Sequence, residues 1–229
     1  MSIFYDFISL IFPRVCAACG KPLFKFENVI CTFCEQNLPR TNFHEEKDNP
    51  VSRTFWGRVN LENAAAMLYF NKGSKVQTLI HKLKYKGKKE VGIRIGEIYG
   101  KDLRESELYK DVDIIIPVPL HLAKQRKRGY NQSEMIAIGL GKSFNKFVDT
   151  QTLKRVKHTE TQTKKSRIKR WENVKEIFEV KNTDGFKNKH ILLVDDVLTT
   201  GATIESCVNA FGTDPGFRIS VITIAYAKN

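Results

Sequence analysis

The stretch from Ile191 to Thr203 constrains the fold more than any other part of the 229-residue sequence. The apolar run from Ile191 to Val194 predicts a short buried strand, and Asp195 and Asp196 follow it directly. A loop of small and hydroxylated residues comes next and leads into apolar residues at helical spacing. Similar strands alternate with helical segments along the rest of the chain. This alternation predicts an α/β fold with a mostly parallel sheet flanked by helices.

The acidic pair and the loop after it suit a phosphorylated sugar. Ligands of open α/β sheets bind at the carboxyl ends of the strands, where both acids are expected. Small loop residues let backbone N–H groups approach a phosphate, and the following helix N-terminus adds positive potential. The carboxylates suit hydroxyl groups or a phosphate-bound Mg²⁺. The alternative interpretation is an Asp-capped turn with a helix N-cap at Thr200 or Thr203.

Four of the five cysteines form two pairs near the N-terminus, and each pair has the spacing Cys-x2-Cys. The residues are Cys16, Cys19, Cys31 and Cys34. Two such pairs at short separation are typical of a tetrahedral zinc site, and four thiolates leave no open coordination position for catalysis. The sequence therefore predicts a small module with a structural Zn²⁺. Two disulfides or a redox pair are the competing interpretations.

The chain divides into three predicted parts. Residues 1–40 hold an N-terminal helix over 1–12 and the zinc module, residues 41–60 form a linker, and residues 61–229 form the α/β domain. Strands are expected at 64–70, 112–118, 150–156, 176–180, 191–194 and 219–225, and helices at 75–85, 89–104, 131–145 and 203–211.

The charge of the chain favours anionic partners. Its 38 Lys and Arg residues exceed its 25 Asp and Glu residues by 13, which suits nucleic acid, an acidic membrane surface or phosphorylated small molecules. No apolar run reaches the roughly 18 residues of a transmembrane helix. The N-terminal segment lacks the basic start and cleavage site of a signal peptide, so we expect a cytoplasmic protein.

Two basic runs stand out, at residues 82–89 and 154–170, each with an aromatic residue within it or directly after it. Lysine and arginine with nearby aromatic rings suit single-stranded DNA, through phosphate attraction and base stacking. The second run has another interpretation, because a mobile lid over an active site would occupy residues 155–173. Solvated helix faces would explain both runs as well.

Residues 191–203 resemble the 5-phosphoribosyl 1-pyrophosphate (PRPP) signature of type I phosphoribosyltransferases. Further segments accompany it in order over nearly the whole chain, and the set resembles the ComF family of competence-associated proteins. These segments are the cysteine pairs, Lys-Leu-Lys-Tyr-Lys-Gly at 82–87, Pro-Val-Pro-Leu-His at 117–121, Arg-Gly-Tyr-Asn-Gln at 128–132, Thr161-Gln162, Arg170 and Asn173.

The resemblance implies a type I phosphoribosyltransferase-like sheet and a set of site residues. In that family the acidic pair contacts the ribose hydroxyls, which makes Asp195 and Asp196 the binding and catalytic candidates. The loop that holds the 5-phosphate would be Thr199, Thr200, Gly201, Ala202 and Thr203. Pyrophosphate would meet the segment that ends at His121, with positive charge supplied by Arg126 and Arg128.

Two functions are therefore open. One is an enzyme in which an acceptor of unknown identity displaces Mg²⁺-bound pyrophosphate from PRPP. The other is a protein that binds single-stranded DNA during natural transformation and DNA uptake, with PRPP as a regulatory ligand or with no turnover. Competence or recombination proteins are its expected partners.

Overall fold

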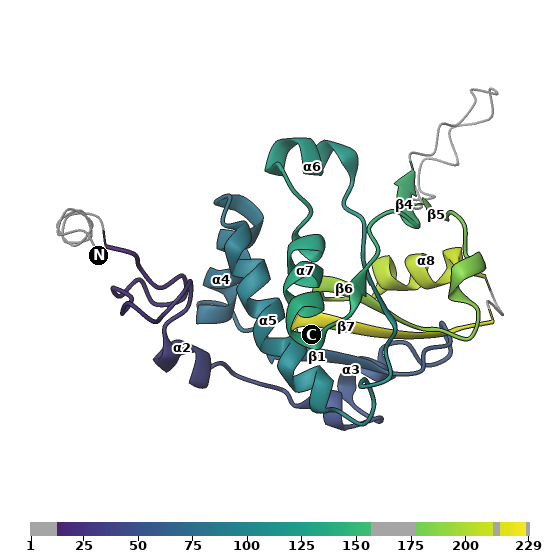
Figure 1. Ribbon diagram of the computed structural model, residues 1–229, viewed down its shortest axis with the longest axis horizontal. Helices are drawn as coiled ribbons and strands as arrows, with labels where there is room; N and C mark the ends of the chain where they lie inside the picture. The colour runs from purple at the N-terminus through teal and green to yellow at the C-terminus, as the bar shows by residue number, and fades with distance from the viewer. Residues whose placement is uncertain (1–12, 157–176, 213–215, 228–229) are drawn as a thin grey trace.

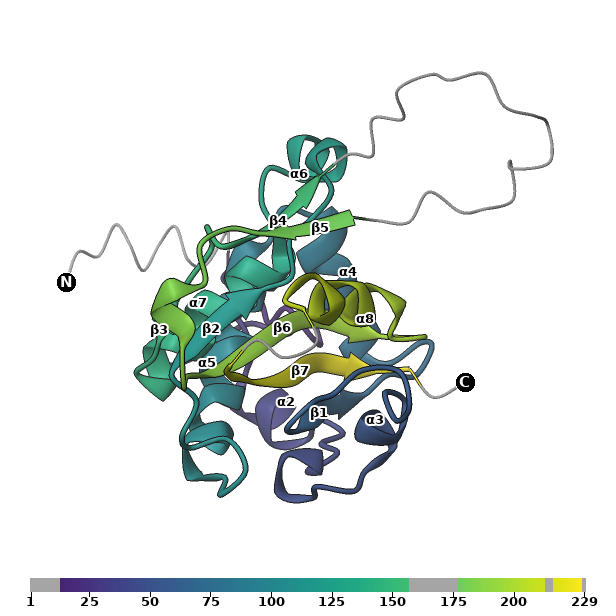
Figure 2. The same cartoon turned by 90° about the vertical axis from the view of Figure 1, so that its right-hand side faces the viewer.

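The computed structural model describes residues 13–156, 177–212 and 216–227, and its centre is a five-stranded sheet. The strand order is β1-β7-β6-β2-β3, and every neighbouring pair is parallel. The strands are β1 (Ala64–Tyr69), β2 (Ile114–Pro117), β3 (Phe147–Val148), β6 (His190–Leu198) and β7 (Arg218–Tyr226). A separate antiparallel ribbon pairs β4 (Leu153–Val156) with β5 (Ile177–Val180), as Figures 1 and 2 show. The predicted α/β fold is confirmed.

Helices connect the parallel strands. The longer ones are α4 (Lys75–Tyr85), α5 (Lys89–Glu105), α7 (Gln132–Phe144) and α8 (Ala202–Ala210). The shorter ones are α2 (Thr32–Gln36), α3 (Pro50–Arg53), α6 (Leu122–Arg128) and two 3₁₀ turns, η1 (Phe43–Glu45) and η3 (Asp184–Phe186). From β2 the chain passes through α7 to β3, whereas from β6 it passes through α8 to β7 in the opposite direction. Right-handed crossovers therefore place α7 and α8 on opposite faces of the sheet.

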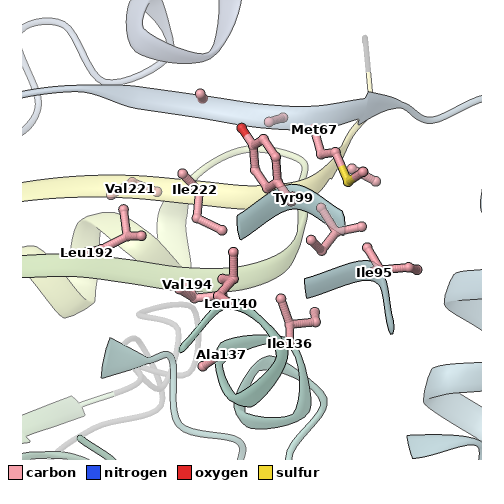
Figure 3. Packing of buried hydrophobic residues seen from close by; sticks show 14 of the residues in the cluster. Met67, Ile95, Tyr99, Ile136, Ala137, Leu140, Leu192, Val194, Val221 and Ile222 are labelled. Carbon is pink, nitrogen blue, oxygen red and sulfur yellow. The ribbon is translucent and has the colours of Figure 1, made fainter. Parts of the chain in front are cut away.

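The α5 and α7 helices approach each other closely because glycines line their contact. A Cβ atom on Gly96 would lie 2.2 Å from the carbonyl oxygen of Ile136, and one on Gly139 would lie 2.0 Å from that of Ile93. Such contacts exclude any side chain, so the pair is fixed by backbone packing. Figure 3 shows the apolar core that this pair forms with the sheet, including Ile95, Tyr99, Ile136, Leu140, Leu192, Val194 and Ile222.

Near the acidic pair, the structure differs from the sequence-based prediction in two elements. The strand predicted at 191–194 is longer, because Asp195 pairs with Thr223 and Leu198 pairs with Tyr226 of β7. The acidic pair therefore lies within β6 and not in the loop after it. The basic segment after β2 forms α6, which is not among the predicted helices, and it buries no residue that would give it an apolar face.

Residues 41–60, the predicted linker, contain η1 and α3 and pack beside β1. Val51 and Phe55 are buried, and Asn49 caps α3 while its side-chain amide donates to the carbonyl of Ala64 at 2.9 Å. The division of the chain at residues 40 and 60 stays a prediction. The predicted helix over 1–12, the possible lid and most of the second basic run lie outside the described residues.

Candidate functional site

The sheet topology has a switch point between the carboxyl ends of β2 and β6. The chain leaves β2 toward β3 and leaves β6 toward β7, so the connections diverge between these two adjacent strands. Ligands of open α/β sheets bind at such a switch point because the diverging connections leave a crevice there. The β6 strand delivers the acidic pair to this place, and Pro117 ends β2 beside it, opposite Val194.

Asp196 is a buried carboxylate with one cationic partner. The residue is 4% exposed, and Nζ of Lys84 lies 2.8 Å from its Oδ1. Its second oxygen, Oδ2, is buried and has no hydrogen-bond partner among the described residues. A buried polar atom without a partner is costly unless something else satisfies it, so Asp196 can still accept a hydrogen bond or bind a cation.

Asp195 is held in place by its neighbours. Its Oδ1 accepts hydrogen bonds from Ser133 Oγ at 2.9 Å and from the Asp196 amide at 2.8 Å. Burial, together with the negative charge of Asp196, raises the pKa of Asp195 to about 7. Asp195 therefore changes its charge near neutral pH, whereas an exposed aspartate would already be ionised.

The loop after β6 is mostly exposed, with Gly201 buried and Thr203 half-buried. Thr199, Thr200 and Ala202 face solvent, and residues 195 and 197–204 line a small cavity of about 40 Å³. Gly201 precedes α8 with a φ of +78°. The first N–H groups of a helix have no partner within that helix, so the start of α8 offers donors to an anion. All five predicted loop residues line this cavity.

Arg58 and Phe55 support the loop from the side of the predicted linker. Nη1 of Arg58 donates to the carbonyl of Thr200 at 2.8 Å, and its guanidinium pairs with Glu205 in the first turn of α8. The ring of Phe55 lies against Gly201, where an added Cβ would be 2.8 Å from its Cε1. Sequence reasoning missed both residues because they lie about 140 positions before the loop and belong to no recognisable motif.

A larger cavity of about 610 Å³ is lined by Lys84, the cation that pairs with Asp196. Among the described residues, the lining holds four cations, four neutral residues and no carboxylate: Lys84, Tyr85, Gly87, Leu120, Lys124, Lys127, Arg128 and Gln132. Lys84 connects this cavity to the acidic pair, because the same side chain binds Asp196. The cavity is therefore suited to an anion that lies beside whatever the acids bind.

The three basic residues predicted for pyrophosphate have different positions. Arg128 lines the larger cavity, and its guanidinium lies 5.7 Å from the ring centre of Tyr85. His121 does not line the cavity. It caps α6, where its Nδ1 accepts from the amide of Ala123 at 3.1 Å. Arg126 is exposed on α6 outside the cavity lining. Lys84 is the cavity cation that contacts the acidic pair directly, through Asp196. In the sequence it is only one of several lysines in the basic run at residues 82–89.

The four paired cysteines form a compact cluster. Their Sγ atoms all lie within 4.8 Å of one another, and no disulfide joins them. The amide of Cys31 donates to Sγ of Cys16 at 3.3 Å, as in zinc knuckles, where amides bond to metal-bound thiolates. The carboxylate of Glu27 holds the loop between the pairs by accepting from the amides of Phe24 and Thr32. Four convergent thiols fit a tetrahedral zinc ion, so this cluster could hold one.

One further polar cluster lies at the other end of β6. Nδ1 of His190 is 2.9 Å from Asp111, and its Nε2 is 2.7 Å from Oγ of Ser220. The order acid, imidazole and hydroxyl is that of a hydrolase triad. However, Ser220 and His190 are fully buried, so no substrate reaches the hydroxyl. The cluster instead joins His190, the first residue of β6, and Ser220 of β7 to Asp111 in the segment before β2.

Comparison with known proteins finds sequence similarity to competence and DNA utilization proteins. No family model matches the sequence. Competence protein F of Haemophilus influenzae is 37% identical over 110 residues, which is 46% of each chain. DNA utilization protein YhgH of Salmonella typhimurium is 31% identical and covers 55% of this chain and 56% of its own. Competence protein ComFC of Bacillus subtilis is 27% identical over 84% of this chain and 75% of its own. The chain is similar in sequence to competence protein F and to ComFC.

The matches to the first two relatives span only about half of those proteins, whereas the match to ComFC spans most of both chains. Among solved structures, adenine phosphoribosyltransferase from Leishmania tarentolae is similar to the ComF-like chain with a TM-score of 0.37 and 14% identity, over 79% of this chain and 89% of that one. No helix in the described part of the ComF-like chain combines the length and the apolar character needed to cross a membrane.

Proposed function

We propose that this ComF-like chain binds PRPP together with Mg²⁺ at the carboxyl ends of β6 and β2. The observation that carries the proposal is the way the acidic pair links two cavities. Asp195 lines the small loop cavity, and its neighbour Asp196 pairs with Lys84, which lines the larger cationic cavity, so that loop, acids and cations follow in this order. PRPP carries a phosphate, two ribose hydroxyls and a pyrophosphate in the same order.

Each part of PRPP then has a partner of suitable chemistry. The amides and hydroxyls of residues 199–203 would hold the 5-phosphate, and Asp195 and Asp196 would accept the ribose hydroxyls. The unsatisfied Oδ2 of Asp196 supports this role, because a hydroxyl donor would satisfy it. Pyrophosphate would lie in the cationic cavity near Lys84 and Arg128. Bound Mg²⁺ would neutralise charge on the pyrophosphate.

A phosphoribosyl transfer at this site would need little covalent chemistry from the protein. The C1–O bond of the ribose breaks, pyrophosphate leaves with the electron pair, and an acceptor nucleophile forms the new bond and loses a proton. The acids hold the ribose, and the cationic cavity stabilises the leaving group. Binding of PRPP depends on the residues described above, whereas turnover depends also on the acceptor.

Calorimetric titration of PRPP in the presence of Mg²⁺ tests the binding site. The double variant Asp195→Asn, Asp196→Asn should lose at least about tenfold in affinity, since two acceptors of ribose hydroxyls lose their charge. The matched control is Glu105→Gln, Glu107→Gln, which makes the same charge change at two exposed acids. Equal affinity of wild type and the acidic-pair variant would reject the site. Pyrophosphate release with a panel of bases and amines then tests turnover.

A second candidate function, single-stranded DNA binding, is favoured by the same cationic surface. The end of α4 and the whole of α6 gather lysines and arginines around Tyr85, whose relative exposure is 68%. An exposed ring beside cations suits base stacking and phosphate contact. The relatives named for competence and DNA utilization agree with this role. In this candidate, competence or recombination proteins are the partners and the cytoplasm is the location.

Titration of labelled single-stranded DNA at two salt concentrations, with and without PRPP, tests this candidate. Steep salt dependence is expected if several phosphates are neutralised. Tyr85→Ala should weaken binding by about fivefold or more through lost stacking. The control is Trp56→Ala, which removes another exposed aromatic ring that lies under Arg53 instead. No binding at low salt, or equal losses in the two variants, would reject this DNA surface.

A further inference from the structure

Lys84 occupies an unusual position because its side chain belongs to both halves of the proposed site, the acidic pair and the cationic cavity. It is the second-last residue of α4, its side chain is 22% exposed, and it lines the cationic cavity. At the same time its Nζ forms an ion pair with Asp196. Of the cations that line this cavity, Lys84 alone pairs with a carboxylate in the part of the chain that the structure describes.

The ion pair restrains Lys84 strongly. The side chain of Asp196 is only 6% exposed, so its carboxylate depends on a neighbouring charge or donor. A buried carboxylate that loses its counterion is strongly destabilised, because water cannot replace the partner. Lys84 can therefore turn toward an anion in the cavity only if another donor takes its place at Asp196.

The other lining cations are arranged differently. Lys124 and Lys127 are exposed on α6, and Arg128 donates to Gln132 and stacks on Tyr85. These three side chains can meet an anion without leaving a buried acid unpaired. Lys84 is therefore the lining cation whose contact with an anion depends on whether Asp196 has another donor.

We propose that Lys84 is a shared cation that couples the two halves of the site. It pairs with Asp196 until ribose hydroxyls bind there, and it then turns to the pyrophosphate group in the cationic cavity. This inference rests on the proposed binding of PRPP and adds that the ribose and pyrophosphate parts bind cooperatively. Coupling of this kind is reciprocal, so each ligand strengthens the binding of the other.

The coupling is measured by titrating the full-length protein with pyrophosphate in Mg²⁺, with and without saturating ribose 5-phosphate. Wild type should bind pyrophosphate about fivefold or more tightly when ribose 5-phosphate is present. In Lys84→Met, which keeps an apolar stem, this ratio should fall to about one, because no cation is then shared between the two halves of the site. The matched control is Lys86→Met, because Lys86 carries the same charge, is exposed and does not line the cavity.

The outcomes separate the inference from the function on which it rests. Coupling that persists in Lys84→Met would overturn the shared-cation role. Equal losses of affinity for pyrophosphate and ribose 5-phosphate would also overturn it, because they would mean that Lys84 only supports the structure of the acidic pair. Either result, with ribose 5-phosphate still bound by wild type, leaves the proposed function intact. A wild-type protein that binds neither ligand would overturn the proposed function itself. Thermal unfolding of each variant shows whether it is folded.

Discussion

The substitution Gly201→Ala tests how the loop after β6 is built. The φ of +78° costs an L-residue roughly 1–2 kcal/mol. The added Cβ would also lie 2.8 Å from Cε1 of Phe55 and 3.3 Å from Cγ2 of Thr54. Phe55 is 1% exposed and cannot move away freely, so overpacking adds about 1–3 kcal/mol. We expect a total loss of about 2–5 kcal/mol in the free energy of unfolding.

A matched glycine separates the two costs. Gly73 has a nearly equal φ of +76°, and a Cβ there would meet nothing within 4 Å. Gly73→Ala should therefore lose only the conformational part, roughly 1–2 kcal/mol. The assay is urea unfolding in the presence of zinc, supported by thermal unfolding, where Gly201→Ala should lower Tm by roughly 5–15 °C. The reasoning is refuted if Gly201→Ala costs no more than Gly73→Ala.

Other variants test the acidic pair, the loop support and the cysteine cluster. Because the folded pKa of Asp195 is raised to about 7, its stabilising contribution is complete below its unfolded pKa near 4 and is lost as pH rises through 7. The urea midpoint of wild type should therefore fall relative to that of Asp195→Asn between pH 4 and pH 8. A difference between the two midpoints that stays constant with pH would contradict the raised pKa of Asp195. Arg58→Ala should weaken ribose 5-phosphate binding several-fold in calorimetry, because the carbonyl of Thr200 loses its hydrogen bond from Arg58. Arg53→Ala, at an exposed arginine, should leave this affinity unchanged. Cys31→Ser should reduce the zinc content from about one ion per chain to nearly none by atomic absorption, and unchanged zinc would reject the cluster as the site.

The sequence predicts the parts of the site that lie in one continuous segment. The apolar run of β6, the acidic pair and the loop are adjacent in the chain, so local patterns reveal both their structure and their chemistry. The cysteine pairs are equally visible, because two closely spaced pairs must meet to bind one ion. The strand boundary at residue 198 was missed because pairing with β7, which the sequence does not display, extends β6.

The rest of the site depends on residues brought together by the fold. Lys84, Arg58 and Ser133 come from three distant segments, and each touches the acidic pair or its loop by a single side chain. None of them stands out, because a lysine in a basic run or a serine at a helix start has many ordinary explanations. The α6 helix was missed for a related reason, since it buries no residue and so has no apolar periodicity.

A crystal structure of the chain grown with ribose 5-phosphate and Mg²⁺ tests the central claim most directly. We expect phosphate density against the amides of residues 199–203, with the ribose hydroxyls within hydrogen-bond distance of Asp195 and Asp196. The ligand found instead on the surface of α6, or a loop whose amides face away from a bound phosphate, would contradict it.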